Sequence, residues 1–238
     1  EYKEASVSVH AVPKVNRTLH ALTVMLPDHN KAPNIYLEEM YEHYQQNEDI
    51  QTTLAEVADA VVEATKEMSK VNPVLDADKI QDNVVLCLVN STQNEELLKD
   101  VPNRSFQDLS VIYRWVVCVD RDGMQSMIIT NDFAAARGFT EEELFQHAVE
   151  NTKRICPPRV KSMQEVMADL AVEDGMPQEI LESMGVFEEI PPEKNLWVLT
   201  NEMGINGAAS MLYEENLHKL AEQIGTDLYL LPSSIHET

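Results

Sequence analysis

The sequence predicts an α+β fold with largely antiparallel sheets and packed helices. Strand-like runs, one of them an uninterrupted apolar run, alternate irregularly with runs of helical periodicity, without the regular strand–helix–strand repetition of a parallel sheet. Of the 238 residues, 44% are hydrophobic, which is enough to build a buried core. We expect a single unit over residues 1–238, or two lobes that divide near residues 100–104.

The first part of the chain predicts a hairpin followed by two helices. Val7 and Val9 alternate with polar residues, and residues 18–26 form a second strand-like run after a turn-rich stretch at 13–17. Residues 36–46 predict a short helix. In the helix that follows, apolar positions recur at spacings of three and four, which predicts one buried stripe. This stripe comprises Leu54, Val57, Ala58, Val61, Val62, Thr65 and Met68.

The centre of the chain carries the strongest strand signals. Residues 84–89 are consecutive apolar residues, which predicts a strand buried on both faces. Residues 109–119 and 124–130 flank Asp-Arg-Asp-Gly at 120–123, a sequence typical of a hairpin turn. Arg114, inside the first of these two strands, is expected on a solvated face or beside a carboxylate.

The last part of the chain contains two helix-start signals. Residues 140–143 form a capping box, Thr-Glu-Glu-Glu, and residues 162–165 repeat the pattern with serine and glutamate. Residues 195–200 and 227–231 predict strands. A helix between these two strands is expected to end at Gly225.

The chain is strongly acidic, because 41 Asp and Glu residues against 18 Lys and Arg residues give a net charge of −23. Direct nucleic-acid binding and adsorption to an anionic membrane are excluded, since both need a basic face. Between residues 162 and 194 nine residues are acidic and one is basic, so residues 171–194 are expected to form an acidic surface excursion. Dispersed acidity favours solubility. The alternative interpretation is an acidic DNA mimic that inhibits a nucleic-acid enzyme.

The composition indicates a soluble cytoplasmic protein. No run approaches the roughly 18 apolar residues of a membrane-spanning helix, and the first residues do not have a signal-peptide pattern. Cys87, Cys118 and Cys156 are too few and too far apart for a disulfide framework. Cys87 and Cys118 lie in apolar runs and are expected to be buried. Basic neighbours could lower the pKa of Cys156, but we expect an inert thiol.

Two segments near the C-terminus contain the candidate binding residues. Loop 201–207 follows a predicted strand and precedes a helix, a position from which backbone N–H groups can hold a phosphate. It lacks the lysine of a P-loop and the third glycine of a dinucleotide site. Segment 233–236 contains two serines and a histidine, the residue types of a nucleophile and its base. The candidate binding residues are Asn201, Gly204, Asn206, Gly207, Ser233, Ser234 and His236.

A hydrolase built from these two segments is one interpretation, because they flank the same predicted helix. It requires the two segments to come within hydrogen-bond reach of each other. No catalytic residue is assigned, since no nucleophile, base and orienting group are recognisable together. We therefore expect a non-catalytic protein that binds a protein partner or a small molecule, and we expect no cofactor.

Three histidines near the N-terminus form the only candidate metal site of the sequence. His10 and His20 would face each other if the first hairpin turned about Val15, and His29 is close in sequence. One residue of slip in the register would separate the pair. We expect exposed strand histidines and no metal, since the sequence contains no HExxH, CxxC or paired-His motif.

Several short motifs occur along the chain. They are APNIYLE at 32–38, LLKDVP at 97–102, LSVIYR at 109–114, IITN at 128–131, EEEL at 141–144 with ENT at 150–152, VLTN at 198–201, GAA at 207–209 and DLYLLPSS at 227–234. In combination, these motifs resemble an uncharacterised bacterial family, a domain of unknown function met in Gram-positive anaerobes. More distantly, they are similar to another uncharacterised family of bacilli. The resemblance spans most of the chain and implies no activity, cofactor or catalytic residue.

Overall fold

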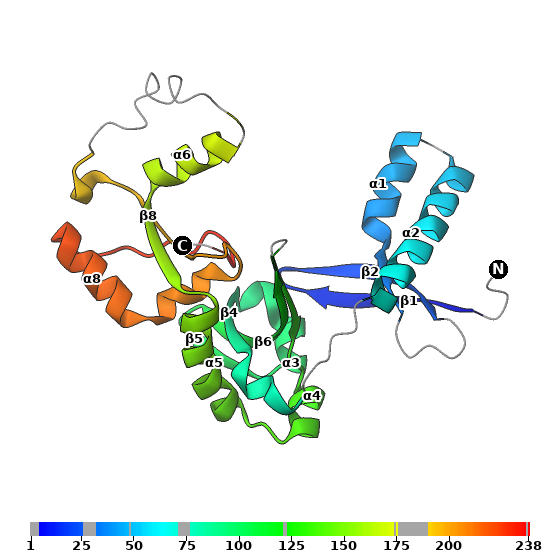
Figure 1. Cartoon of the computed structure of the whole chain (residues 1–238), viewed down its shortest axis with the longest axis horizontal. Coiled ribbons are helices and arrows are strands. Elements are labelled where there is room, and N and C mark those ends of the chain that lie inside the picture. Colours follow the sequence, from blue (N-terminus) through cyan, green and yellow to red (C-terminus); the bar gives the residue numbers. More distant parts are fainter. Residues whose placement is uncertain are drawn as a thin grey trace. The chain divides into compact units, whose positions relative to one another are not determined.

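The computed structural model describes residues 5–25, 32–47, 49–70, 77–120, 123–173, 175, 190–236 and 238, and it confirms the α+β fold (Figure 1). The strands among these residues form three antiparallel sheets. The chain divides into two compact units, the first comprising Glu1–Leu75 and Thr92–Lys99 and the second Asp76–Ser91 and Asp100–Thr238. One of these junctions adjoins the predicted boundary at 100–104, and a division into two lobes at that boundary alone stays a prediction.

The first unit contains a three-stranded sheet with β2 (Arg17–Met25) in the centre. β1 (Ser6–Lys14) pairs with it as the predicted hairpin, and β3 (Asn34–Tyr36) pairs with its other edge. The turn is stabilised by Asn16, which has a φ of 63° and donates its backbone N–H to Asn94 Oδ1 at 2.7 Å. Asn94 belongs to the short helix η2 (Thr92–Asn94) that precedes α3 (Glu95–Asp100).

Two helices, α1 (Leu37–Asn47) and α2 (Ile50–Lys70), follow the sheet and lie to one side of the hairpin (Figure 1). Among the described side chains of α2, Thr53, Val57 and Val61 are buried, whereas Leu54 is 54% exposed and Ala58 is also exposed. The predicted stripe was therefore wrong at Leu54 and Ala58. Val62 and Thr65 are half-buried, and the side chain of Met68 lies outside the described residues. The buried positions of this helix are thus centred one residue earlier than the predicted stripe.

The main sheet of the second unit is built around β6 (Leu109–Asp120). β4 (Val84–Asn90) pairs with one edge of it, while β5 (Asn103–Phe106) and β7 (Gly123–Ile128) pair with successive parts of the other edge. The six apolar residues of β4 are all buried, which confirms a strand covered on both faces. The β6–β7 hairpin is also confirmed.

Arg114 of β6 has neither of the two expected surroundings. It is half-buried and donates to the Oγ of Ser126 at 2.9 Å and to the backbone oxygen of Ser126 at 3.0 Å. Ser126 lies in β7, so the guanidinium links the two strands of the hairpin. The sequence pattern did not indicate that a serine would take the place of a carboxylate.

Three helices pack with this sheet: η1 (Ala77–Asp82), α4 (Asn131–Arg137) and α5 (Glu141–Ile155). The capping box at the start of α5 is confirmed, with both reciprocal bonds between Thr140 and Glu143 present. Leu144 and Ala148 are completely buried, and Thr152 accepts the backbone N–H of Leu86 at 2.8 Å. These contacts fix α5 against β4.

The remaining elements of the second unit surround a two-stranded sheet of β8 (Pro158–Ser162) and β9 (Trp197–Asn201). They are α6 (Met163–Glu173), η3 (Pro192–Lys194), η4 (Gly207–Leu212) and α8 (Glu214–Ile224). The second capping box is confirmed between Ser162 and Glu165. Most of the predicted acidic excursion at 171–194 lies outside the described residues.

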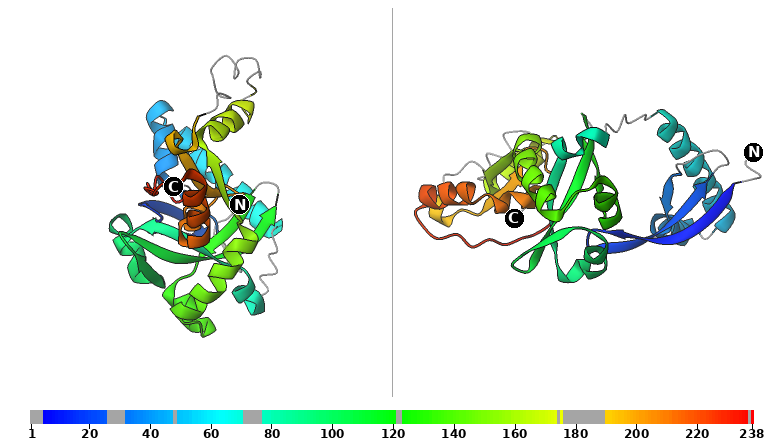
Figure 2. Two further views of the ribbon diagram at one scale, coloured as in Figure 1. Left: turned by 90° about the vertical axis from the view of Figure 1, so that its left-hand side faces the viewer. Right: turned by 90° about the horizontal axis from the view of Figure 1, so that it is seen from below.

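The predicted strand at 227–231 was wrong. These residues form an extended connection without a partner strand (Figure 2). Tyr229 is 91% exposed and Leu231 is 69% exposed. An alternating apolar sequence favours a strand only where a neighbouring strand offers its edge, and among the described residues none lies along this segment.

Candidate binding groove

Loop 201–207 is held in shape by the buried side chain of Asn201. Its Oδ1 accepts the backbone N–H groups of Met203 at 3.0 Å and Ile205 at 3.3 Å, and its Nδ2 donates to the Ile205 oxygen at 2.7 Å. Gly204 and Asn206 take positive φ angles of 64° and 55°. Asn201 therefore organises a tight loop.

The backbone N–H groups of this loop are already used within the protein. Besides the two bonds to Asn201 Oδ1, Glu202 donates to the Pro157 oxygen at 3.0 Å and Gly204 donates to the Asn201 oxygen at 3.2 Å. A phosphate-binding loop presents free N–H groups to its ligand. The geometry therefore does not favour a phosphate at residues 202–205.

The structure brings the two predicted segments together. The C-terminal segment, which we define as residues 226–236 and 238, returns to β9 and η4. His236 Nδ1 accepts the Asn206 N–H at 3.1 Å, and the His236 backbone oxygen accepts the Thr200 hydroxyl at 2.8 Å. Thr238 exchanges two backbone hydrogen bonds with Leu199, at 2.7 and 3.0 Å. The segment is thus fastened to the edge of β9.

These contacts do not form a nucleophile and its base. Ser234 Oγ accepts the backbone N–H of His236 at 2.9 Å, which is a local turn interaction, and the imidazole Nδ1 is occupied by the Asn206 N–H. Both Ser233 and Ser234 are exposed. A hydrolase needs the serine hydroxyl within reach of the imidazole, so this arrangement favours an anchoring function for His236.

Beside this anchored segment lies an apolar groove of about 580 Å³. Its walls come from α6, β9, α8 and the first half of the C-terminal segment. The lining includes several apolar side chains with large exposed fractions: Leu170 56%, Leu196 57%, Leu230 37%, Leu231 69% and Tyr229 91%. Ser233 is the one predicted binding residue among the lining residues of this groove. We call this site the C-terminal groove.

The polar side chains of the C-terminal groove are few and carry no positive charge. Among the described residues, Glu193 and Asp227 are its charged lining residues, and neither lysine nor arginine lines it. Trp197 donates its indole N–H to the Pro192 oxygen at 3.2 Å, which holds the ring in the groove wall. A volume of this size with apolar walls and a few polar groups is typical of ligand sites.

Residues 1–238 match the model of a protein family that is described as a family of unknown function, DUF5688. The chain belongs to the DUF5688 family. No curated protein and no solved structure is significantly similar to it. In the described part of this DUF5688 chain, no helix has the length and apolar character needed to span a membrane.

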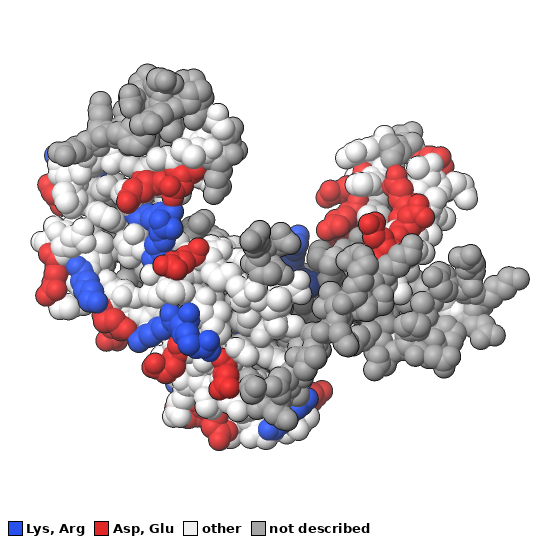
Figure 3. All heavy atoms as spheres, in the orientation of Figure 1, with Lys and Arg blue, Asp and Glu red and all other residues white. Residues whose placement is uncertain are grey.

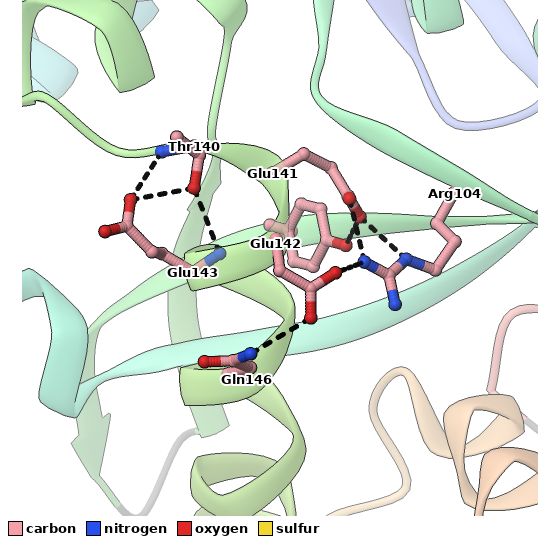
Figure 4. A network of polar contacts seen from close by, with 7 residues as sticks. Arg104, Thr140, Glu141, Glu142, Glu143 and Gln146 are labelled. Atoms are coloured by element: carbon pink, nitrogen blue, oxygen red, sulfur yellow. Dashed lines mark hydrogen bonds and ion pairs between the residues drawn. The ribbon is translucent and has the colours of Figure 1, made fainter.

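A second group of polar side chains connects β5 and β6 to the start of α5 (Figure 4). Arg104 binds the Glu141 carboxylate with two nitrogens, at 2.9 and 3.1 Å, and also contacts Glu142. The buried Tyr113 donates its hydroxyl to Glu141. Burial, with help from Glu141, raises the pKa of Tyr113 far above its ordinary value, and the Arg104 hydrogen bond lowers the pKa of Glu142. All four groups are paired, so the network fixes the helix to the sheet.

The candidate histidine site, which we did not expect to hold a metal, is not assembled in the described part of the chain. The register pairs His10 with Ala21 and His20 with Ala11, so the two imidazoles lie on opposite faces of the hairpin. His20 instead contacts Glu38 at 2.9 Å, and this hydrogen bond lowers the pKa of Glu38. His29 lies outside the described residues, among which no group of three metal-ligating side chains occurs.

The three cysteines have two kinds of surroundings. Cys87 and Cys156 are buried, and desolvation raises the pKa of each thiol to about 11. This agrees with the prediction of an inert Cys156. Cys118, in contrast, is exposed, so its predicted burial was wrong. It follows an irregularity in the β6–β7 register between Val116 and Cys118, which an apolar sequence run does not reveal.

Acidic and basic side chains are interspersed on the face of the second unit seen in Figure 3. Lys153 pairs with Glu215 at 2.8 Å, and Lys161 pairs with Asp169, whose carboxyl pKa is lowered by this contact. A DNA mimic needs a continuous band of carboxylates. The mixed charges on this face give that interpretation no support.

Proposed function

We propose that this DUF5688 chain is a non-catalytic binding protein whose C-terminal groove holds an apolar segment of a partner polypeptide that carries basic residues. The observation that supports it is the large exposed apolar surface that the described residues form around the groove. Leu170, Leu196 and Leu231 are each more than half exposed. Clustered exposed apolar side chains mark interaction sites on otherwise polar surfaces.

The chemistry of the partner follows from charge. In the described part of the chain, Glu193 and Asp227 are the charged lining residues of the groove, and the whole chain carries −23. An acidic segment would be repelled, whereas lysines or arginines flanking apolar side chains would be attracted. A polypeptide is preferred to a small molecule because the walls are open and formed partly by the extended residues 226–231.

We further propose that the protein is bacterial and cytoplasmic. The motif resemblance supports a bacterial protein of Gram-positive anaerobes, with a distant relation to a family of bacilli. The three cysteines are free thiols, which suits a reducing cytoplasm. The acidic surface supports the absence of direct nucleic-acid and membrane binding.

Two synthetic peptides test the proposal. They share one apolar sequence and differ only in their flanks, which are lysines in one and glutamates in the other. Binding is followed by the fluorescence of Trp197, and a Trp197→Phe variant shows that the signal comes from the groove. We expect the lysine-flanked peptide to bind at least about tenfold more tightly, as complementary charge predicts.

Two matched variants separate the groove from the general acidity of the chain. Leu196→Asp adds a negative charge inside the groove, and Val119→Asp adds the same charge at an apolar residue of β6 that is 48% exposed and outside it. Electrostatic attraction alone would strengthen binding in both. We expect Leu196→Asp to abolish binding and Val119→Asp to preserve it. Equal affinities for the two variants would refute the proposal, and so would binding of the neutral dye Nile red without binding of either peptide.

A further inference from the structure

Among the described residues, the outer edge of β1 in the first unit has no pairing strand, and protective residue types occur only at its end, Pro13 and Lys14. β1 pairs with β2 alone among the described residues, over nine residues in continuous register without a bulge. Residues 6–11 are all exposed, with Val7 at 64% and Val9 at 57%. Monomeric proteins shield such edges with charged residues, bulges or covering elements. Between Ser6 and Val12 the sequence contains no lysine, arginine, aspartate or glutamate.

The register identifies which backbone groups are available at this edge. The hairpin turns through two residues, Val15 and Asn16, between paired residues Lys14 and Arg17. Such a turn closes on a hydrogen-bonded pair, and the pairs then alternate along the strands. Even-numbered residues of β1 therefore bond to β2. The backbone N–H and C=O groups of Val7, Val9 and Ala11 point outward.

From this geometry we infer that two copies of the chain associate by antiparallel pairing of their β1 strands, with the two-fold axis at Val9. Val9 then pairs with Val9 of the second copy, and Val7 pairs with Ala11. Every outward N–H and C=O group of these three residues finds a partner in this register. An isologous contact requires a surface that complements itself, and this strand meets that condition.

The side chains support the same register. Opposite residues of an antiparallel pair lie on the same face, so the valines of both copies form one apolar row. This row continues on β2, where Val24 is opposite Val7 and Leu22 is opposite Val9. Leu22 is in turn opposite Ile35 of β3. The pairing would thus join two three-stranded sheets with a continuous apolar face.

The lack of charged residues on this strand favours a second copy of the chain over a basic partner such as the one proposed for the C-terminal groove. Two chains of −23 repel each other, and an uncharged strand is where they can approach most closely. A basic partner would find no carboxylate between Ser6 and Val12 to pair with. Salt screens repulsion between exposed charges, so this dimer should become tighter as the ionic strength rises.

Sedimentation velocity over a range of protein and salt concentrations tests the inference with the full chain. We expect a monomer–dimer equilibrium whose Kd falls as salt is added. Val9→Lys should raise the Kd roughly 100-fold, because two like charges would face each other across the axis. Ser8→Lys adds the same charge one residue away, where the side chain lies on the other face and the backbone bonds to β2. It should change the Kd by less than about threefold, since separated exposed charges interact weakly.

Three results would overturn the inference. They are a wild-type monomer at every concentration, equal effects of Val9→Lys and Ser8→Lys, and a dimer that weakens with added salt. Circular dichroism of both variants confirms that the hairpin has folded. Because Val9 contributes exposed surface and not core, both variants should retain the wild-type spectrum.

Discussion

Replacing Gly207 by alanine should release the C-terminal segment from the second unit. A Cβ at this position would overlap the His236 backbone oxygen and the Thr200 hydroxyl, and it would lie 2.9 Å from the Asn201 nitrogen. Two of these atoms belong to the backbone, and the Thr200 hydroxyl is fixed by its bond to the His236 oxygen. No rotation of a flexible side chain can relieve the overlap.

The expected loss follows from the hydrogen bonds that hold the segment. Three lie directly at the overlap: Asn206 to the His236 imidazole, Thr200 to the His236 oxygen, and Ala208 to the Ile235 oxygen at 3.3 Å. Two more join Leu199 and Thr238. At a net contribution of about 1 kcal/mol each, the variant should lose about 3 kcal/mol of unfolding free energy if three bonds break, and about 5 kcal/mol if all five break.

Hydrogen exchange and urea denaturation measure the two consequences. In Gly207→Ala the amide hydrogens of Leu199, Asn206 and Ala208 should exchange faster than in the wild type. The variant should also unfold at a lower urea concentration. The control is Gly204→Ala, where φ is +64° and the added Cβ would meet no atom within 4 Å. That variant should lose about 1 kcal/mol through backbone strain while keeping wild-type exchange at these amides. Wild-type protection in Gly207→Ala would refute the steric argument.

Three further predictions concern the second unit. Arg104→Met should lower the unfolding free energy, measured by urea denaturation, by about 2 kcal/mol, because the Glu141 carboxylate loses a two-nitrogen partner. Arg104→Lys should recover less than half of this loss, since lysine cannot bind the carboxylate with two nitrogens. Full recovery of stability by lysine would contradict the prediction. The backbone N–H and hydroxyl of Thr140 hold the folded pKa of Glu143 below its ordinary 4.5, so this stabilisation is present above pH 4.5 and lost as the pH falls further. The urea midpoints of wild type and Thr140→Val should therefore converge in acid, and a constant difference would count against the assignment. Titration with a thiol reagent should label one cysteine rapidly in the native protein, and Cys118→Ser should remove that fast reaction; a second fast thiol would show that a buried cysteine is accessible.

The elements that could be predicted from the sequence are those decided by near neighbours in the chain. The capping boxes at 140–143 and 162–165 need only residues three apart, and both are present. The buried β4 follows from an apolar run that no exposed strand would tolerate. Each of these signals is contained within a few consecutive residues, so no knowledge of the tertiary fold is needed to interpret them.

The candidate histidine site shows what local sequence signals cannot predict, namely the register of a hairpin. A turn about Val15 would have paired His10 with His20, whereas the turn through Val15 and Asn16 pairs His10 with Ala21. The difference is one residue, and it depends on Asn16 taking a positive φ and on its bond to Asn94, 78 positions away. A contact so distant in sequence cannot be inferred from the pattern of the strand itself.

The C-terminal groove is lined by residues 227–231, the same residues for which a strand was wrongly predicted. The alternation in DLYLL correctly indicates that this segment needs apolar contacts and backbone partners, but a sequence does not say whether the protein itself supplies them. In the described structure, residues 228–232 have no hydrogen bond, and Tyr229 and Leu231 remain exposed beside Leu196. An unsatisfied strand pattern next to apolar walls is physically costly unless something covers it. The failed secondary-structure prediction is therefore consistent with the proposal that a partner polypeptide occupies this groove.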